Sequence, residues 1–355
     1  PSSRPAAYKS ATELRWACWD ARDGICRELP RFADLVPTSS NGRWPDWAVA
    51  LAPDGTPWIY GDTDLRVLGP DGTPRAQPWK GQRGHLLYFA RENPLVAVLW
   101  EDTLSIHDRN SLELKSTLIG HTNQVMSVAF SRDGRRLLTA SPDQTARLWD
   151  ITASSALCLA TLPHAQEVLA VAFSPDERRC ATLARDRTVR VFDLATQAEL
   201  ASFGAEDLDP NCLLYPSDEE VASLTVDGSF VAWNLGGRAT HVLEGHGNTL
   251  RSAMPVTGTG LIATAAWDGL NGQPGALRLW DADSGEAVAT CFGPGWIVDR
   301  LAASPDGHTL AATLSRWPER LHELLLVDTL VGRVTRVACE CRLLSVAFDP
   351  EGRVV

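Results

Sequence analysis

Lysine is almost missing from this chain of 355 residues. Its only lysines are Lys9, Lys80 and Lys115, so 30 of its 33 basic residues are arginines, and its net charge is −11. Binding along DNA or RNA needs concentrated positive charge, so this balance argues against a general nucleic-acid role. Many Arg, Ala, Gly and Pro residues beside so few Lys are typical of a GC-rich genome, which predicts a bacterial source.

Long apolar runs and secretion signals are missing as well. No apolar segment approaches the roughly 20 residues of a membrane-spanning helix. The opening residues, PSSRPAAYKS, contain no apolar core of a signal peptide. We therefore expect a cytoplasmic protein with no membrane partner.

The familiar catalytic and metal motifs are absent from the sequence. The patterns GxxxxGK[ST], HExxH and GxSxG do not occur. Among the eight cysteines, Cys339 and Cys341 are separated by one residue, and no second pair completes a zinc set. We expect structural thiols, no metal, no cofactor and no enzymatic activity.

What the chain does contain is a repeat. Turns of the Ser-Pro-Asp-Gly type recur at residues 131–134, 174–177, 304–307 and 349–352. Strand ends of the Trp-Asp type recur at Trp149-Asp150, Phe192-Asp193, Trp233-Asn234 and Trp280-Asp281, at intervals of 43, 41 and 47 residues. A period of about 40–45 residues with four strand-sized segments is typical of a propeller blade.

Labelling the strands of a blade a to d from the inside outward gives eight candidates for strand a and eight for strand c. The a segments are 47–52, 86–90, 125–130, 168–173, 212–215, 250–254, 298–303 and 343–348, and the c segments are 14–20, 65–69, 104–108, 145–150, 188–193, 230–235, 276–281 and 324–328. Alternation of apolar and polar residues in several of them fits strands packed between neighbouring blades.

The predicted fold is an all-β propeller of four-stranded blades, forming one domain over residues 1–355. Seven blades lie between about 45 and 342, and residues 1–30 supply c and d strands that pair with the a and b strands of 343–355. This split eighth blade closes the ring and hides free sheet edges. A total of seven blades is the alternative, if one weak unit is an insertion. Because the chain ends in mid-strand, we expect a larger parent protein.

These residues resemble the WD-repeat family of β-propellers. The blade that begins at Gly120-His121 has His121, Thr139, Asp143 and Trp149 at the positions where the family has a hydrogen-bonded tetrad. The resemblance implies that imidazole links the carboxylate to the hydroxyl, and that the hydroxyl accepts from the indole.

Other blades carry the tetrad in part. One has His164, Thr182 and Asp186, with Phe192 in place of tryptophan, and another has Ser223, Asp227 and Trp233 without a histidine. A third has His246, Thr264, Asp268 and Trp280, with an insertion at 269–275. The blades around 47–79, 86–116 and 298–337 are divergent. A hydroxyl, His and Asp could also form a catalytic triad, but the recurrence of the set favours a structural role.

In the resembled family, the start of strand a and the residue before the tetrad Asp point to the face that carries the d–a and b–c loops. Carried over position by position, this gives the candidate partner-binding residues Trp100, Glu101, Gln124, Met126, Glu167, Arg185, Arg251, Trp267, Arg300 and Arg342, with Arg316 and Trp317 on a long b–c loop. Arg and Trp are enriched at binding hot spots, and Arg matches carboxylates. The alternative is that the tryptophans pack between blades and the arginines are solvated.

We therefore predict a non-catalytic interaction scaffold, or a sensor or regulatory domain, that binds a protein or peptide near the central channel. The partner is expected to be acidic or aromatic, or another domain of the same polypeptide such as a signalling enzyme. The alternative is an enzyme or small-molecule-binding propeller that uses the central channel.

Overall fold

The structure is a computed structural model of the chain. It describes residues 17–19, 26–28, 48–52, 56–60, 64–68, 74–80, 84–90, 93–100, 103–153, 155–204, 208–225, 230–236, 239–243, 250–256, 259–266, 277–281, 284, 286–291, 296–304, 306–316, 321–330, 333–339, 346, 348 and 354. Its elements in these ranges are all strands. The same ranges hold no helix long and apolar enough to cross a membrane.

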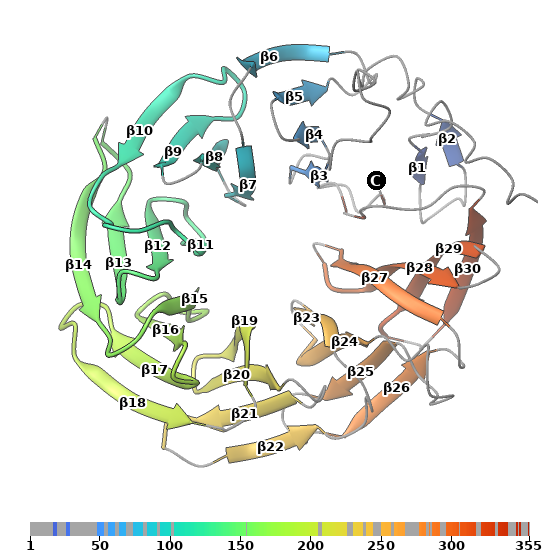
Figure 1. Ribbon diagram of the computed structural model, residues 1–355. Coiled ribbons are helices and arrows are strands. Elements are labelled where there is room, and N and C mark those ends of the chain that lie inside the picture. Colours follow the sequence, from blue (N-terminus) through green and yellow to red (C-terminus); the bar gives the residue numbers. More distant parts are fainter. Residues whose placement is uncertain are drawn as a thin grey trace, which may run out of the picture.

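Within these ranges, seven antiparallel sheets have four strands each, in sequence order from the inside outward (Figure 1). The first four are β3 (Ala48–Leu51), β4 (Pro57–Tyr60), β5 (Asp64–Leu68) and β6 (Pro74–Lys80); β7 (Gly84–Phe89), β8 (Leu95–Trp100), β9 (Thr103–Asp108) and β10 (Leu114–Leu118); β11 (Ser127–Phe130), β12 (Arg136–Ser141), β13 (Thr145–Asp150) and β14 (Leu157–Pro163); β15 (Val168–Phe173), β16 (Arg179–Ala184), β17 (Thr188–Asp193) and β18 (Glu199–Gly204).

The other three are β19 (Leu208–Ser217), β20 (Glu220–Thr225), β21 (Phe230–Asn234) and β22 (Ala239–Leu243); β23 (Leu250–Val256), β24 (Leu261–Ala266), β25 (Leu277–Asp281) and β26 (Ala287–Cys291); β27 (Trp296–Ala303), β28 (Thr309–Arg316), β29 (Leu321–Asp328) and β30 (Val334–Cys339). Figure 1 shows the sheets following one another around a common centre. Such sheets are propeller blades, which confirms the predicted fold class. Each blade is named below by its innermost strand.

The sequence explains which strands are buried. The second and third strands of a blade are covered on both faces by neighbouring blades, and so β12, RLLTAS, is buried along nearly its whole length. The outer strand β14 instead alternates exposed and buried residues at its C-terminal end. Leu138 and Leu148 of the β11 blade pack with Val168 and Val171 of the β15 blade, so the core lies between blades.

The repeated turns join the first two strands of a blade through side-chain chemistry. Ser131 Oγ donates to Asp133 Oδ1 at 2.6 Å and accepts from the backbone N–H of Arg136 at 2.9 Å. Gly134 follows with a φ of 64°, in the left-handed region that glycine tolerates best. Ser174 and Ser304 make the corresponding hydroxyl contacts in their own turns.

The two ends of the chain supply incomplete sheets. Near the N-terminus β1 (Ala17–Trp19) pairs with β2 (Cys26–Glu28), and near the C-terminus Phe348 and Val354 form an antiparallel bridge. Phe348, Val354 and Val346 pack on Leu324 and Leu326 of the β27 blade. The inner strands of a following blade are expected on this side of the β27 blade. Pairing between the two ends lies outside the described residues, and ring closure by a split blade stays a prediction.

Candidate functional site

The β11 blade holds a buried chain of polar groups. His121 Nδ1 is 2.7 Å from Asp143 Oδ2, and His121 Nε2 is 2.7 Å from the Thr139 hydroxyl. The Trp149 indole N–H donates to the same hydroxyl at 2.9 Å. The structure therefore brings together the four residues that the resemblance to WD repeats assigns to a tetrad.

The direction of each hydrogen bond follows from the carboxylate. Ionised Asp143 can only accept, so His121 Nδ1 carries the proton and Nε2 accepts from Thr139. Burial lowers the pKa of His121 despite the neighbouring carboxylate, which keeps the ring neutral. Burial pushes the pKa of Asp143 upward, but hydrogen bonds from Thr145, His121 and the Thr122 N–H outweigh it and hold that pKa below its usual value.

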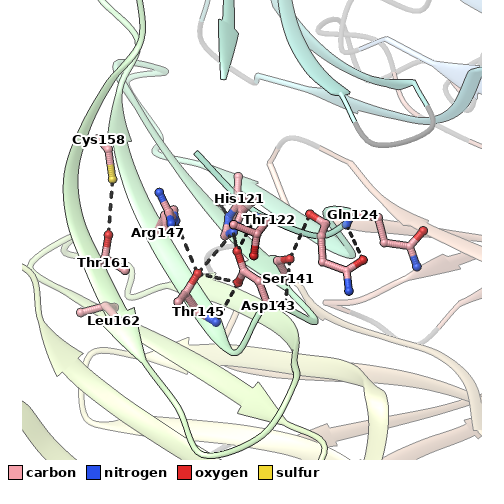
Figure 2. A network of polar contacts seen from close by, with 12 residues as sticks. His121, Thr122, Gln124, Ser141, Asp143, Thr145, Arg147, Cys158, Thr161 and Leu162 are labelled. Atoms are coloured by element: carbon pink, nitrogen blue, oxygen red, sulfur yellow. Dashed lines mark hydrogen bonds and ion pairs between the residues drawn. The ribbon is translucent and has the colours of Figure 1, made fainter. Parts of the chain in front are cut away.

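This network fixes the loop that leads into β11. Asp143 Oδ2 accepts from the Thr122 N–H at 3.0 Å, and the Ser141 hydroxyl donates to the Asn123 carbonyl at 3.2 Å (Figure 2). The Met126 N–H donates to the Ala140 carbonyl at 2.8 Å. Residues 122–126 are thus held by the end of β12 and the b–c turn of their own blade.

In the β15 blade the arrangement is incomplete. His164 Nε2 is 2.8 Å from the Thr182 hydroxyl, but His164 Nδ1 faces the Leu162 carbonyl at 3.1 Å instead of a carboxylate. Asp186 Oδ1 accepts from the N–H and the hydroxyl of Thr188. Asp143 makes the same turn contacts with Thr145, so the difference lies in His164, whose Nδ1 faces the Leu162 carbonyl and leaves Asp186 outside the expected tetrad. Phe192 contacts the His164 ring edge-on, with centroids 5.6 Å apart.

Two further blades retain hydroxyl and indole. In the β23 blade the Trp280 indole N–H donates to the Thr264 hydroxyl at 2.6 Å. In the β19 blade Ser223 and Trp233 are both buried, and Trp233 stacks on Phe203 at 5.8 Å. The other tetrad candidates of these blades, Asp227, His246 and Asp268, lie outside the described residues.

Strand register shows what replaces the tetrad in the divergent blades. The position of Thr139, which pairs with Arg147, is taken by Val98 in the β7 blade and by Ala312 in the β27 blade. In these two blades an apolar side chain therefore replaces the buried hydroxyl of the tetrad.

The β7 blade also holds a polar pair that sequence reasoning missed. His107 occupies the tryptophan position and lies 2.9 Å from the Ser105 hydroxyl. The only sequence signal was the dipeptide His107-Asp108 where Trp149-Asp150 stands in the β11 blade.

The hydroxyl, imidazole and carboxylate of the β11 blade are placed for structure and not for hydrolysis. Thr139 has 0% exposed surface, and its oxygen already contacts His121 and Trp149, so a substrate cannot approach it. Among the described residues, no group of three or more His, Cys, Asp or Glu is arranged to hold a metal.

Several partner-binding candidates lie exposed at the loop end of the β11 and β15 blades. Gln124 is exposed and Met126 is 41% exposed, on the loop that the tetrad fixes. In the β15 blade, Arg185 Nη1 lies 2.7 Å from Glu167 Oε2, and the Arg185 N–H donates to the Glu167 carbonyl at 2.8 Å. Part of the Arg185 guanidinium is therefore already engaged by Glu167.

Extra residues in the inner strands alter the expected register. Strands β15, β23 and β27 each contain a bulge, at Leu169, Arg251 and Asp299 respectively. Arg300, although exposed, is therefore one residue past the position of Arg251, and Asp299 occupies that position. Sequence spacing could not show this, because a bulge adds one residue on one strand alone.

The remaining candidates differ in their surroundings. Trp100 is half-buried and packs on the core between the β3 and β7 blades, which matches the alternative reading for this tryptophan. Arg316 lies over the Trp296 ring, 5.8 Å from its centroid. Glu101, Trp267, Trp317 and Arg342 lie outside the described residues.

Comparison with known families agrees with this geometry. The family described as WD domain, G-beta repeat, matches residues 112–150 and 156–193. These residues run from the outer strand of the β7 blade to the third strand of the β15 blade. The chain therefore contains WD40 repeats.

Related proteins of known name share parts of the chain. It is 39% identical to Protein Notchless of Drosophila melanogaster over 198 residues, which are 54% of this chain and 39% of that protein. It is 46% identical to Nuclear distribution protein PAC1 of Arthroderma otae over 63 residues, 18% of this chain and 14% of PAC1. It is 41% identical to Vegetative incompatibility protein HET-E-1 of Podospora anserina over 66 residues, 19% of this chain and 4% of that protein.

The chain thus matches well under two thirds of the length of each of these relatives. All three come from eukaryotes, so the bacterial source expected from composition is not supported.

Proposed function

We propose that this chain is a non-catalytic interaction platform. It binds a protein or peptide on the face of the β11 and β15 blades that carries their d–a and b–c loops, which we call the loop face. The observation that carries the proposal is the loop 122–126, which a buried network holds while Gln124 and Met126 stay exposed. A fixed loop loses little conformational entropy on binding, and an exposed methionine adapts to apolar partner groups.

We propose further that the partner presents an acidic or aromatic group to Arg185. Its side chain is 66% exposed, and its guanidinium is paired with Glu167 on one side. A partner carboxylate can bind the same guanidinium, because this group has five N–H donors and Glu167 engages only part of them. Scaffolding or regulation is the role that fits a surface that binds a protein or peptide.

The test is an affinity pull-down from native lysate, followed by crosslinking of the captured protein to the bait. The variant is Met126→Glu with Arg185→Glu. The matched control is Arg178→Glu, because Arg178 and Arg185 flank opposite ends of β16 and both are exposed. All baits must show the same thermal unfolding.

We expect one or more proteins to bind the unchanged chain and the control, to be lost with the variant, and to crosslink near residues 122–126. Equal capture by all three baits would contradict the assignment of this face, as would capture by none.

A further inference from the structure

The outermost strands of three consecutive blades expose leucine side chains. Leu114 on β10 is 58% exposed, Leu157 and Leu159 on β14 are 62% and 42% exposed, and Leu200 on β18 is 49% exposed. Single exposed leucines are ordinary, but neighbouring ones form an apolar patch of the kind that marks a contact surface. These four residues are called the outer strip below.

Two hydrogen bonds show that the three strands are neighbours. The Ala156 N–H, just before β14, donates to the Ser116 hydroxyl of β10 at 2.6 Å. On the other side, the Gln197 amide, just before β18, donates to the Leu159 carbonyl at 3.4 Å. Figure 1 shows β10, β14 and β18 following one another along the outer wall.

Two of these leucines point outward because each is the extra residue of a strand bulge. Leu159 is the extra residue between Cys158 and Ala160, which oppose Trp149 and Leu148. Leu200 is the extra residue between Glu199 and Ala201 in β18 in the same way. A bulge interrupts the free edge of a strand, so the outer strip is suited to side-chain contact and not to the addition of a further strand.

The centre of the strip carries no charge, although 22% of the chain is charged. Residues 151–166, which include all of β14, contain no Asp, Glu, Lys or Arg. A charged partner group would lose hydration there with no counter-charge to compensate. Two copies of a chain with net charge −11 repel each other, and an uncharged strip is where they meet with least repulsion.

The strands on either side of β14 each contain one charged residue, Lys115 in β10 and Glu199 in β18, and Glu199 Oε2 also lies 3.8 Å from Arg190 Nη1. Lys115 on β10 and Glu199 on β18 are both exposed. A two-fold axis that lies in the contact plane and runs along β14 sets the β10 side of one copy against the β18 side of the other. Lys115 then faces Glu199 of the second copy, while leucine meets leucine at the centre, as a two-fold contact requires.

We propose that the outer strip is a dimer interface between two copies of this chain. It lies on the outer wall, away from the loop face of the proposed function. Failure of one proposal therefore does not imply failure of the other. Because apolar contact holds the dimer against net repulsion, added salt strengthens association by screening that repulsion.

The test is sedimentation equilibrium of the 355-residue chain over about 1–100 μM, a range that covers weak to moderate dimers. We expect a monomer–dimer equilibrium that Leu159→Glu weakens about tenfold or more. The matched control is Leu330→Glu, since Leu330 is 66% exposed between β29 and β30. Figure 1 shows these two strands on the opposite side of the common centre from β14. This control is expected to dimerise like the unchanged chain.

A charge exchange tests the orientation of the two copies. Lys115→Glu and Glu199→Lys are each expected to weaken the dimer, and the double variant to restore it. A monomer throughout the concentration range, open-ended oligomers, or equal dimerisation of Leu159→Glu and the unchanged chain would overturn the proposal. Failure of the double variant to recover would overturn the two-fold arrangement.

Discussion

The side chain of Asn93, in the β7 blade, occupies the space beside Gly134 in the β11 blade. Asn93 Nδ2 donates to the Gly134 carbonyl at 2.9 Å and to the Asp133 carbonyl at 3.3 Å. A Cβ added at Gly134 would overlap the Asn93 amide. The turn of the β11 blade therefore receives a side chain of the preceding blade, and we expect the two positions to be energetically coupled.

Gly134→Ala is expected to lower the free energy of unfolding for two reasons. A left-handed φ of 64° costs a non-glycine residue about 1–2 kcal/mol, and the new methyl displaces Asn93. Gly260→Ala isolates the first cost, because Gly260 has a φ of 67° and nothing within 4 Å of its Cβ position. Urea unfolding of both variants measures the difference.

The double variant Asn93→Ala with Gly134→Ala tests the coupling itself. Its destabilisation is expected to fall short of the sum of the single variants by about 0.5–3 kcal/mol, the range for residues in contact. Strict additivity would show that the two residues do not interact.

Thr139→Val is expected to destabilise the protein more than Thr182→Val. Thr139 joins His121 and Trp149, so its loss leaves two buried groups without a partner, at about 1–3 kcal/mol each. Thr182 serves one ring, His164, since Phe192 has no donor. Urea unfolding at pH 7 gives both values, and equal losses would contradict the argument.

Stability is expected to fall as the pH drops below about 6.5, the ordinary pKa of histidine. Burial lowers the pKa of His121 in the folded state, so the unfolded chain binds more protons between the two pKa values. This contribution is intact above the unfolded pKa and is lost as the pH falls toward the folded one. His121→Gln is expected to flatten the dependence in part, because His107 and His164 also have pKa values lowered by burial.

The control for this pH effect is His308→Gln, whose side chain is exposed. Thermal or urea unfolding between pH 5 and pH 8 is the measurement. A slope in His121→Gln as steep as in the unchanged chain would contradict the assignment of the loss to His121.

The ion pair of Glu167 and Arg185 is expected to add little to stability. Their side chains are 35% and 66% exposed, and exposed pairs contribute about 0.2–1 kcal/mol. Glu167→Gln should therefore unfold at nearly the same urea concentration, while it leaves Arg185 free to engage a carboxylate partner more tightly. Binding of the protein captured by the loop face, measured by calorimetry, is expected to strengthen. Weaker binding would mean that Glu167 itself contacts the partner.

The fold class could be read from the sequence because each blade repeats a local pattern. The predicted segment 168–173 coincides with β15 (Val168–Phe173), and 145–150 with β13 (Thr145–Asp150). Boundaries shifted where no repeat signal exists: the predicted segment 212–215 became β19 (Leu208–Ser217). Turn chemistry and strand alternation are local properties, so they are visible without tertiary contacts.

Site residues were harder to place, because their roles depend on neighbours that sequence does not display. Asp186 has the right spacing for a tetrad, but His164 Nδ1 faces the Leu162 carbonyl instead of this carboxylate. Arg300 has the right composition for the inner rim, but a bulge moves it by one position. His107 stands at the tryptophan position of its blade, and its role was found only through its contact with Ser105.

By itself the sequence determined the blade period and the four-stranded sheets, because these rest on spacing along the chain, while its resemblance to WD repeats implied the tetrad His121, Thr139, Asp143 and Trp149. Only the tertiary structure decided that Asn93 fills the space beside Gly134, and that Leu159 and Leu200 point outward on adjacent blades. Those relationships join residues about 40 positions apart, and they depend on how one blade packs against the next. Such packing depends on side-chain shape and on contacts between blades, which spacing along the chain does not display.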